Sequence, residues 1–256
     1  MTVSLFVVTY RKDAEFFGYL AKSYIKFVRG FSEFVVACPH EDVALFKTLG
    51  AEIPNYRVVG YKENYEKGHL KHQVENDKAE QYCKGDFVCH IDSDCLFTDY
   101  CCAEDFFVDG KSVIWMEKYE NFRESCAIRY KWRSCVTRSL GIEPEYEYMS
   151  CLPITYPRDF YPIYRQAVEA HTGMEFEAHV LSGRATFPYD YADYPAMGVL
   201  AHKIMPERFY WRDADSRPKA NCWFVQHKGK RFRQFWSHGG VTPECKAEID
   251  RVLSQP

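Results

Sequence analysis

The sequence predicts an α/β fold in which helices cover a mostly parallel sheet. Short apolar runs, rich in β-branched and aromatic residues, recur through the first 100 positions. Stretches of helical pattern, about ten to fifteen residues long, separate these runs. Strands that are apolar along their whole length are buried on both faces, as in a parallel sheet whose crossovers are helices.

Four strands are expected in this first part, each a short run of mainly apolar residues: Ser4–Thr9, Phe34–Cys38, Tyr56–Gly60 and Phe87–Ile91. Three helices are expected between them, at Ala14–Val28, Glu41–Leu49 and Leu70–Cys83. Gly50 and Gly85 follow the second and third helices, and glycine readily takes the backbone conformation that ends a helix. Ligands collect at the carboxyl ends of the strands in such a sheet, so functional residues are expected there.

After residue 100 the regular alternation is lost. A strand is expected at Ser112–Met116, and helices are expected at Ser125–Leu140 and Phe160–His171. Pro162 falls in the first turn of the last helix, where proline is well tolerated. Neither a linker nor a repeat divides the chain, so we expect one domain over residues 1–256 with an irregular second half.

The composition is that of a globular protein. Hydrophobic residues make up 46% of the chain and charged residues 27%, whereas disordered chains are poorer in apolar residues. The formal net charge is −3, from 33 Lys and Arg against 36 Asp and Glu, so the whole molecule exerts no attraction on nucleic acid or an anionic membrane. Aromatic residues reach 17%, enough to line a cleft as well as to fill a core.

The eleven cysteines contain no C-x-x-C pair, so we expect free thiols in a reducing compartment and no cysteine zinc site. The apolar run over residues 3–8 is too short for a signal peptide. No run approaches the roughly 18 apolar residues that a membrane span needs. These features predict a cytoplasmic protein without a membrane span.

An acidic motif follows the fourth expected strand directly. Residues Asp92, Ser93 and Asp94 continue the strand, and side chains two positions apart in an extended segment point the same way. Two such carboxylates can share one Mg²⁺ or Mn²⁺, with substrate phosphates and water as the remaining ligands. The motif therefore suits an enzyme that binds a nucleoside diphosphate through a metal ion.

In this context the chain resembles the metal-dependent glycosyltransferases of GT-A fold, in particular small bacterial and viral members. Residues 7–13 resemble the first strand and nucleoside-binding loop of that family, and residues 68–73 resemble its donor-side helix start. The resemblance implies a Rossmann-like fold with a nucleotide-binding half at residues 1–100 and an acceptor-binding half at residues 101–256. It also implies a nucleotide-sugar donor, which would contact the following residues: Thr9, Tyr10, Arg11, Asp13, His72, Gln73, Asp92, Ser93, Lys228 and Lys230.

The same resemblance implies that Asp92 and Asp94 bind Mn²⁺ or Mg²⁺ with a histidine. Residues 224–230 resemble the family's strand-then-histidine segment, which indicates His227, although one residue separates it from the next glycine where several members have two. His238 is equally well placed. Lys228 and Lys230 would compensate the charge of the diphosphate.

Residues 192–198 resemble the acidic helix start that lies below the acceptor in many inverting members. Inversion requires a base that takes the proton of the acceptor hydroxyl, and Asp193 is the candidate. The same position also suits a simple helix N-cap, and in a retaining enzyme Asp193 would position the substrate instead.

Two other functions fit parts of the sequence. A phosphatase or phosphotransferase of haloacid-dehalogenase type would use Asp92 as its nucleophile, and a sugar- or nucleotide-binding module would use the same site without turnover. The acceptor of a transferase would be a glycan or a lipid-linked sugar, or else a hydroxylated DNA base. The sequence indicates neither the sugar nor the oligomeric state.

Overall fold

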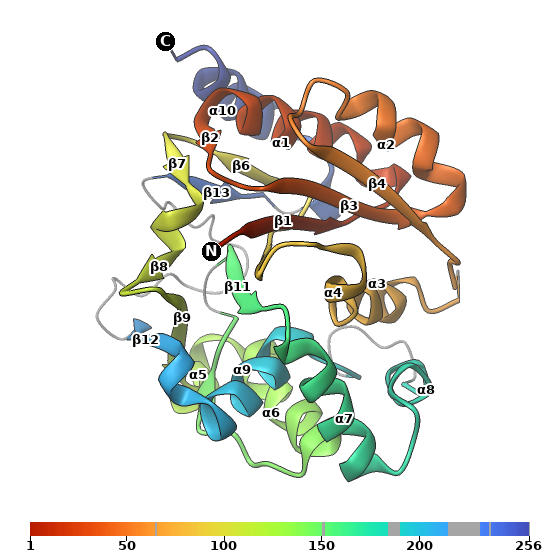
Figure 1. Cartoon of the computed structure of the whole chain (residues 1–256), viewed down its shortest axis with the longest axis vertical. Helices are drawn as coiled ribbons and strands as arrows, with labels where there is room; N and C mark the ends of the chain where they lie inside the picture. Colours follow the sequence, from red (N-terminus) through yellow and green to blue (C-terminus); the bar gives the residue numbers. More distant parts are fainter. Residues whose placement is uncertain (65, 150–151, 184–189, 215–230, 236, 256) are drawn as a thin grey trace.

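The computed structural model describes residues 1–64, 66–149, 152–183, 190–214, 231–235 and 237–255. Its centre is a five-stranded sheet with the strand order β11-β5-β1-β3-β4 (Figure 1). These strands are β1 (Val3–Val8), β3 (Glu33–Pro39), β4 (Tyr56–Tyr61), β5 (Phe87–His90) and β11 (Ile154–Pro157). The first four are parallel, and β11 is antiparallel to β5. The predicted α/β class with a mostly parallel sheet is confirmed.

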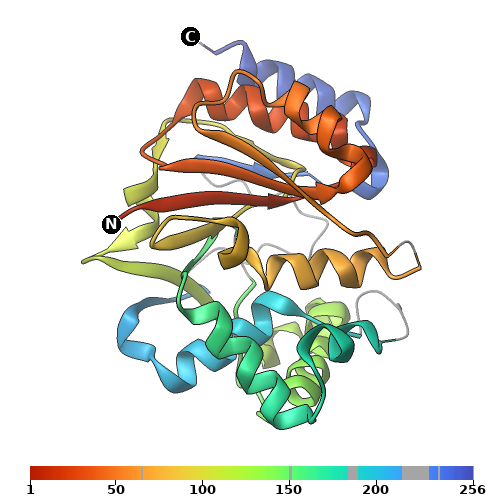
Figure 2. The same cartoon turned by 45° about the vertical axis from the view of Figure 1, so that its right-hand side comes forward.

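Helices cover both faces of this sheet, as Figures 1 and 2 show. One face carries α1 (Ala14–Phe27) and α2 (Val43–Leu49), and α3 (Gly68–Asn76) and α4 (Ala79–Tyr82) lie on the opposite side. All six residues of β1 are buried. Phe17 and Tyr24 of α1 pack their rings against Phe34 of β3, with centroids 6.1 and 4.9 Å away. Apolar strands therefore lie inside two helical layers, as their composition predicts.

The second half contributes most of a helical region beside the sheet. Its helices are α5 (Phe122–Ser125), α6 (Ala127–Leu140), α7 (Phe160–Thr172), α8 (Phe176–Leu181) and α9 (Asp193–Ile204). A second sheet contains β8 (Phe107–Val108), β9 (Lys111–Lys118), β10 (Tyr146–Glu147) and β12 (Phe209–Asp213). Within the described part of the chain, every helix is too short or too polar to cross a bilayer.

Two strand pairs and a final helix return the chain to the first half. Strand β6 (Cys95–Phe97) pairs with β13 (Phe232–Gln234), and β2 (Val28–Arg29) pairs with β7 (Cys101–Cys102). Helix α10 (Pro243–Leu253) packs on α1. The pairing of β6 with β13 brings residues from the end of the chain beside the acidic motif that precedes β6.

The helix expected at Leu70–Cys83 is broken into α3 and α4, so the prediction of one continuous helix is wrong. The break lies at Asp77, whose backbone carbonyl accepts a hydrogen bond of 2.6 Å from Arg165 of α7. The backbone N–H of Gln81 then bonds to the carbonyl of Lys78 instead. Similarly, the helix expected at Ser125–Leu140 is interrupted at Cys126, which has non-helical backbone angles.

Candidate functional site

Polar residues follow three of the parallel strands at one edge of the sheet. Strand β1 leads into Thr9 and the 3-10 turn at Arg11–Asp13, and β3 leads into a second turn at His40–Asp42. Strand β5 leads into the motif of Asp92, Ser93 and Asp94. The structure therefore places the acidic motif at the carboxyl edge of the sheet, where ligands of such folds collect.

The carboxylates of Asp92 and Asp94 face one common point. The side-chain amide of Gln234, in β13, donates to Asp92 Oδ2 at 2.9 Å and lies 3.5 Å from Asp94 Oδ1. Asp94 Oδ2 also accepts the backbone N–H of Ser237 at 3.1 Å. A single NH₂ group therefore lies within 3.5 Å of a carboxylate oxygen of both residues.

Burial and repulsion between neighbouring acidic groups favour the protonated forms of these carboxyl groups. Burial raises the pKa of Asp94 to about 7. The pKa of Asp92 lies well above its usual range because Asp92 is buried and because Asp94, Asp193 and Asp13 repel its charge. Four acidic side chains thus lie close together at this edge of the sheet, and a bound cation would favour their ionised forms.

Asp13 and Ser93 connect two of the loops at this edge. The hydroxyl of Ser93 lies 3.4 Å from Asp13 Oδ2, and Ser93 itself is buried. Asp13 also lies close enough to Asp92 and Asp94 to raise the pKa of both. The loops that follow β1 and β5 therefore form one acidic surface.

Asp193 is the first residue of α9 and is 5% exposed. The N-cap of α9 is Ala192, so the alternative role of Asp193 as N-cap is wrong. Its Oδ2 accepts a hydrogen bond of 3.1 Å from the side chain of Asn76, at the end of α3. Burial raises the pKa of Asp193 to about 6, against the opposing effect of its hydrogen bonds. A carboxylate in this range can accept a proton near neutral pH.

Behind Asp193 lies a buried polar network around Asp77. The hydroxyl of Tyr191 donates to Asp77 Oδ2 at 2.7 Å and also bonds to the hydroxyl of Tyr164. Burial and the nearby charge of Asp193 raise the pKa of Asp77 well above its usual range. This network fixes the end of α3, which also carries Asn76.

Three predicted donor-binding residues lie at the end of β1. Thr9 is fully buried, and its hydroxyl has no hydrogen-bond partner among the described residues. Tyr10 is 38% exposed. Arg11 is largely exposed, but its Nε donates to Asp42 Oδ1 at 2.6 Å, and its backbone N–H donates to Asp42 Oδ2. Asp42 therefore fixes the direction of the Arg11 guanidinium.

His72 and Gln73 lie on α3, on the side of the sheet away from α1. Burial lowers the pKa of His72 to about 4, so its imidazole is neutral at physiological pH. The side-chain oxygen of Gln73 is buried and has no hydrogen-bond partner in the described part of the chain. These residues remain predicted donor contacts.

His227, Lys228 and Lys230 lie outside the described residues, and so does the side chain of His238. Among the residues that the structure describes, no group of three or more His, Cys, Asp or Glu side chains could hold a metal ion. Asp92 and Asp94 could supply two oxygen ligands, a number that is common for Mg²⁺ when substrate phosphates complete its shell.

Sequence reasoning missed Gln234, Asn76 and Asp42. Gln234 contacts Asp92 across 142 positions, and Asn76 contacts Asp193 across 117. No local sequence pattern indicates contacts between residues so far apart in the chain. Asp42 is the second residue of the helix expected at Glu41–Leu49, and the only local signal was that this helix begins soon after the strand expected at Phe34–Cys38.

If Asp94 binds Mn²⁺, the pKa of its carboxyl group predicts how that binding depends on pH. In the folded protein this pKa is raised from 3.8 to about 7, so metal-free protein loses stability as the pH rises through that interval. A cation competes with the proton and restores stability once the carboxylate is ionised. We expect Mn²⁺ to raise Tm clearly at about pH 7.5 and little at about pH 5, as measured by thermal denaturation. An equal rise at both values would contradict this account.

Comparisons with known proteins give the following findings. Residues 3–230 match the model of a family described as a family of unknown function, DUF6492. No curated protein matches the sequence. Among solved structures, the chain is similar to the crystal structure of the galactosyltransferase LgtC in complex with donor and acceptor sugar analogues, with 12% identity and a TM-score of 0.44. That similarity covers 81% of this chain and 72% of the other.

Proposed function

The chain belongs to the DUF6492 family, and we propose that it is a glycosyltransferase of GT-A type, which transfers a sugar from a nucleotide-sugar donor to a hydroxyl acceptor. One observation carries this proposal: Asp92 and Asp94 share a hydrogen-bonding point at the carboxyl edge of a parallel sheet, with Asp193 close enough to raise the pKa of Asp92. A cation-binding pair and a separate buried carboxylate suit sugar transfer from a diphosphate donor with inversion at the anomeric carbon.

The donor is proposed to bind residues from the first half of the chain. Thr9, Tyr10 and Arg11 would contact the nucleoside, with Asp42 holding the Arg11 guanidinium in place. Gln73 offers a buried oxygen to a donor hydroxyl. Asp92 and Asp94 would hold Mn²⁺ or Mg²⁺ with a histidine, either His227 or His238. When bound, such an ion neutralises the diphosphate that leaves.

The second half is proposed to bind the acceptor. Asp193 would take the proton of the acceptor hydroxyl as the new glycosidic bond forms, with inversion at the anomeric carbon. Asn76 holds Oδ2 of Asp193, so the carboxylate has a fixed orientation before the substrate arrives. Burial of Asp193 excludes water from the proton acceptor.

Hydrolysis of candidate donors tests the proposal. The protein is incubated with a panel of UDP-, GDP- and dTDP-sugars, with and without Mn²⁺, and release of the free nucleotide is measured. We expect slow hydrolysis of one donor that depends on the metal. Release of phosphate from p-nitrophenyl phosphate would indicate a phosphatase instead. Donor binding without any turnover would indicate a binding module.

Removing Asn76 tests the orientation of Asp193. The Asn76 hydrogen bond favours the ionised carboxylate, so Asn76→Ala is expected to raise the pKa of Asp193 above its value of about 6. The acid limb of the pH–kcat profile should therefore move to higher pH. In an Asp193→Asn background the same substitution should cause no further shift. An unchanged profile would show that the bond does not control the base.

A further inference from the structure

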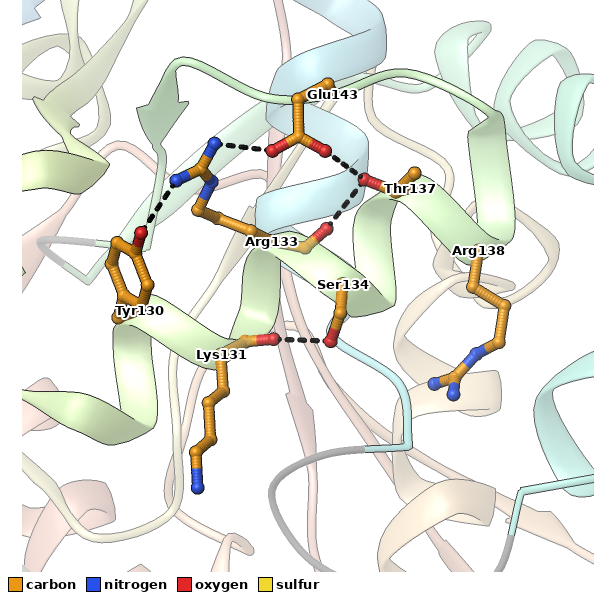
Figure 3. Close-up of a pocket in the computed structure, with 7 residues that line it drawn as sticks. All are labelled: Tyr130, Lys131, Arg133, Ser134, Thr137, Arg138 and Glu143. Carbon is orange, nitrogen blue, oxygen red and sulfur yellow. Dashed lines mark hydrogen bonds and ion pairs between the residues drawn. The ribbon is translucent and has the colours of Figure 1, made fainter. Parts of the chain in front are cut away.

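A groove runs along the exposed side of α6, in the half of the chain proposed to bind the acceptor. It has a volume of about 640 Å³ and is lined by Tyr130, Lys131, Arg133, Ser134, Thr137, Arg138 and Glu143 (Figure 3). Three of these residues are cationic and one is acidic, so the lining carries a net charge of +2. Helix α6 itself contains four Arg or Lys residues and no Asp or Glu. The groove therefore favours an anion.

On one side of the groove, a basic and an acidic side chain neutralise each other's charge. The guanidinium of Arg133 forms an ion pair with Glu143 and donates to the hydroxyl of Tyr130 at 3.1 Å. The hydroxyl of Thr137 donates to Glu143 Oε2 at 3.0 Å. Glu143 is the one acidic residue of the lining, and these contacts hold it and Arg133 in place.

The other side presents Lys131, Ser134 and Arg138. These residues are three and four positions apart, so they share one face of the helix. All three are exposed. Figure 3 shows Lys131 and Arg138 extending from the same side of α6, with Ser134 between them. Seven residues of helix span about 10.5 Å, and two long cationic side chains at that spacing can reach one anionic group between them.

The groove lies beside the segment that leads to Asp193. Helix α6 packs against α9, which begins at Asp193. In addition, the guanidinium of Arg138 donates to the backbone carbonyl of Asp190, three residues before Asp193. This bond ties the groove to the segment that precedes α9. A ligand on Lys131 and Arg138 would thus lie beside the segment that leads into α9.

We propose that Lys131 and Arg138 bind the phosphate or carboxylate of an anionic saccharide, the acceptor of the transfer reaction. This assignment to the acceptor rests on the proposed function. Arg138 can bind either anion with two parallel hydrogen bonds, and Lys131 adds a second charge. A membrane surface fits less well, because recognition of anionic lipid uses clusters of about four to eight basic residues. Of the four basic residues of α6, Arg129 is buried and Arg133 is paired with Glu143.

Binding of small anionic sugars tests the inference without any need for turnover. Glucose 6-phosphate and glucuronate are titrated by calorimetry and by NMR, with glucose and inorganic phosphate as controls. We expect both anionic sugars to bind more tightly than either control. Lys131→Ala and Arg138→Ala should each weaken this binding about tenfold, as expected for loss of a charged hydrogen bond. Lys47→Ala, an exposed lysine on α2, should leave it unchanged.

Several results would overturn the inference. In one such result, neither anionic sugar binds at all. In another, glucose or inorganic phosphate binds as tightly as the anionic sugars. In a third, neither substitution changes the affinity for the anionic sugars. Tight binding to vesicles of phosphatidylserine and phosphatidylcholine that is lost in the two variants would indicate a membrane surface instead. Donor hydrolysis by the unaltered protein tests the proposed function separately, so failure of one proposal can be distinguished from failure of the other.

Discussion

Replacing Asp94 with asparagine is expected to reduce metal-dependent donor hydrolysis on the order of 10³-fold, because a bound metal ion contributes several kcal/mol to stabilising the leaving charge. The asparagine side chain has nearly the same size, and its amide oxygen can still accept the N–H of Ser237, but it has no negative charge to offer a cation. The measurement is nucleotide release from the donor over a range of Mn²⁺ concentrations.

The same substitution should stabilise the metal-free protein. Asp94 is buried beside Asp92 and Asp13, and its pKa of about 7 shows that ionisation at neutral pH is unfavourable in the folded state. Asp94→Asn removes that cost, so Tm without metal should rise at about pH 7.5, and the further rise caused by Mn²⁺ should disappear.

A matched substitution nearby provides the control for both measurements. Asp99→Asn changes an exposed carboxylate five residues farther along the chain and should alter neither Tm nor hydrolysis. Full activity of Asp94→Asn would remove the metal-binding role from the motif. A lower Tm would mean that the charge of Asp94 stabilises the fold, which contradicts the raised pKa.

The sequence predicts those parts of the site whose position depends on a local pattern of neighbouring residues. Strand β5 is apolar, and the acidic motif follows it directly, so the position of Asp92 and Asp94 at a sheet edge depends only on adjacent residues. Their partner Gln234 reaches them because β13 pairs with β6. That pairing joins segments more than 130 positions apart, and neither segment has a pattern that specifies the other.

The break between α3 and α4 has a similar origin. Residues 70–83 have a helical pattern, and local preference alone predicts one helix. The carbonyl of Asp77 is instead bonded to Arg165, and its carboxylate is bonded to Tyr191. Both partners lie far along the chain, so tertiary contacts override a weak local preference. The break leaves Asn76 at the end of α3, where its side chain meets Asp193.

Asp193→Asn is expected to lower kcat for sugar transfer by about 10²- to 10⁴-fold, the usual contribution of general base catalysis. The amide retains the shape of the carboxylate but cannot accept the proton of the acceptor hydroxyl. Because the proton moves only in the transition state, KM for the donor should change little. Steady-state kinetics with a saturating acceptor separate the two quantities.

The control for this substitution is Asp159→Asn. Asp159 is an exposed acidic residue just before α7, and it forms an ion pair with Arg208. Loss of that surface ion pair should have at most a small effect, so the rate of transfer should stay nearly unchanged. Equal loss of kcat and of donor affinity in Asp193→Asn would assign Asp193 to donor binding.

Retention of the anomeric configuration in the product would also exclude a base that acts in direct inversion, because the acceptor oxygen would then occupy the face that the diphosphate has left. The stereochemistry of the product therefore decides whether the buried carboxylate beside Asn76 accepts the proton or only positions the sugar.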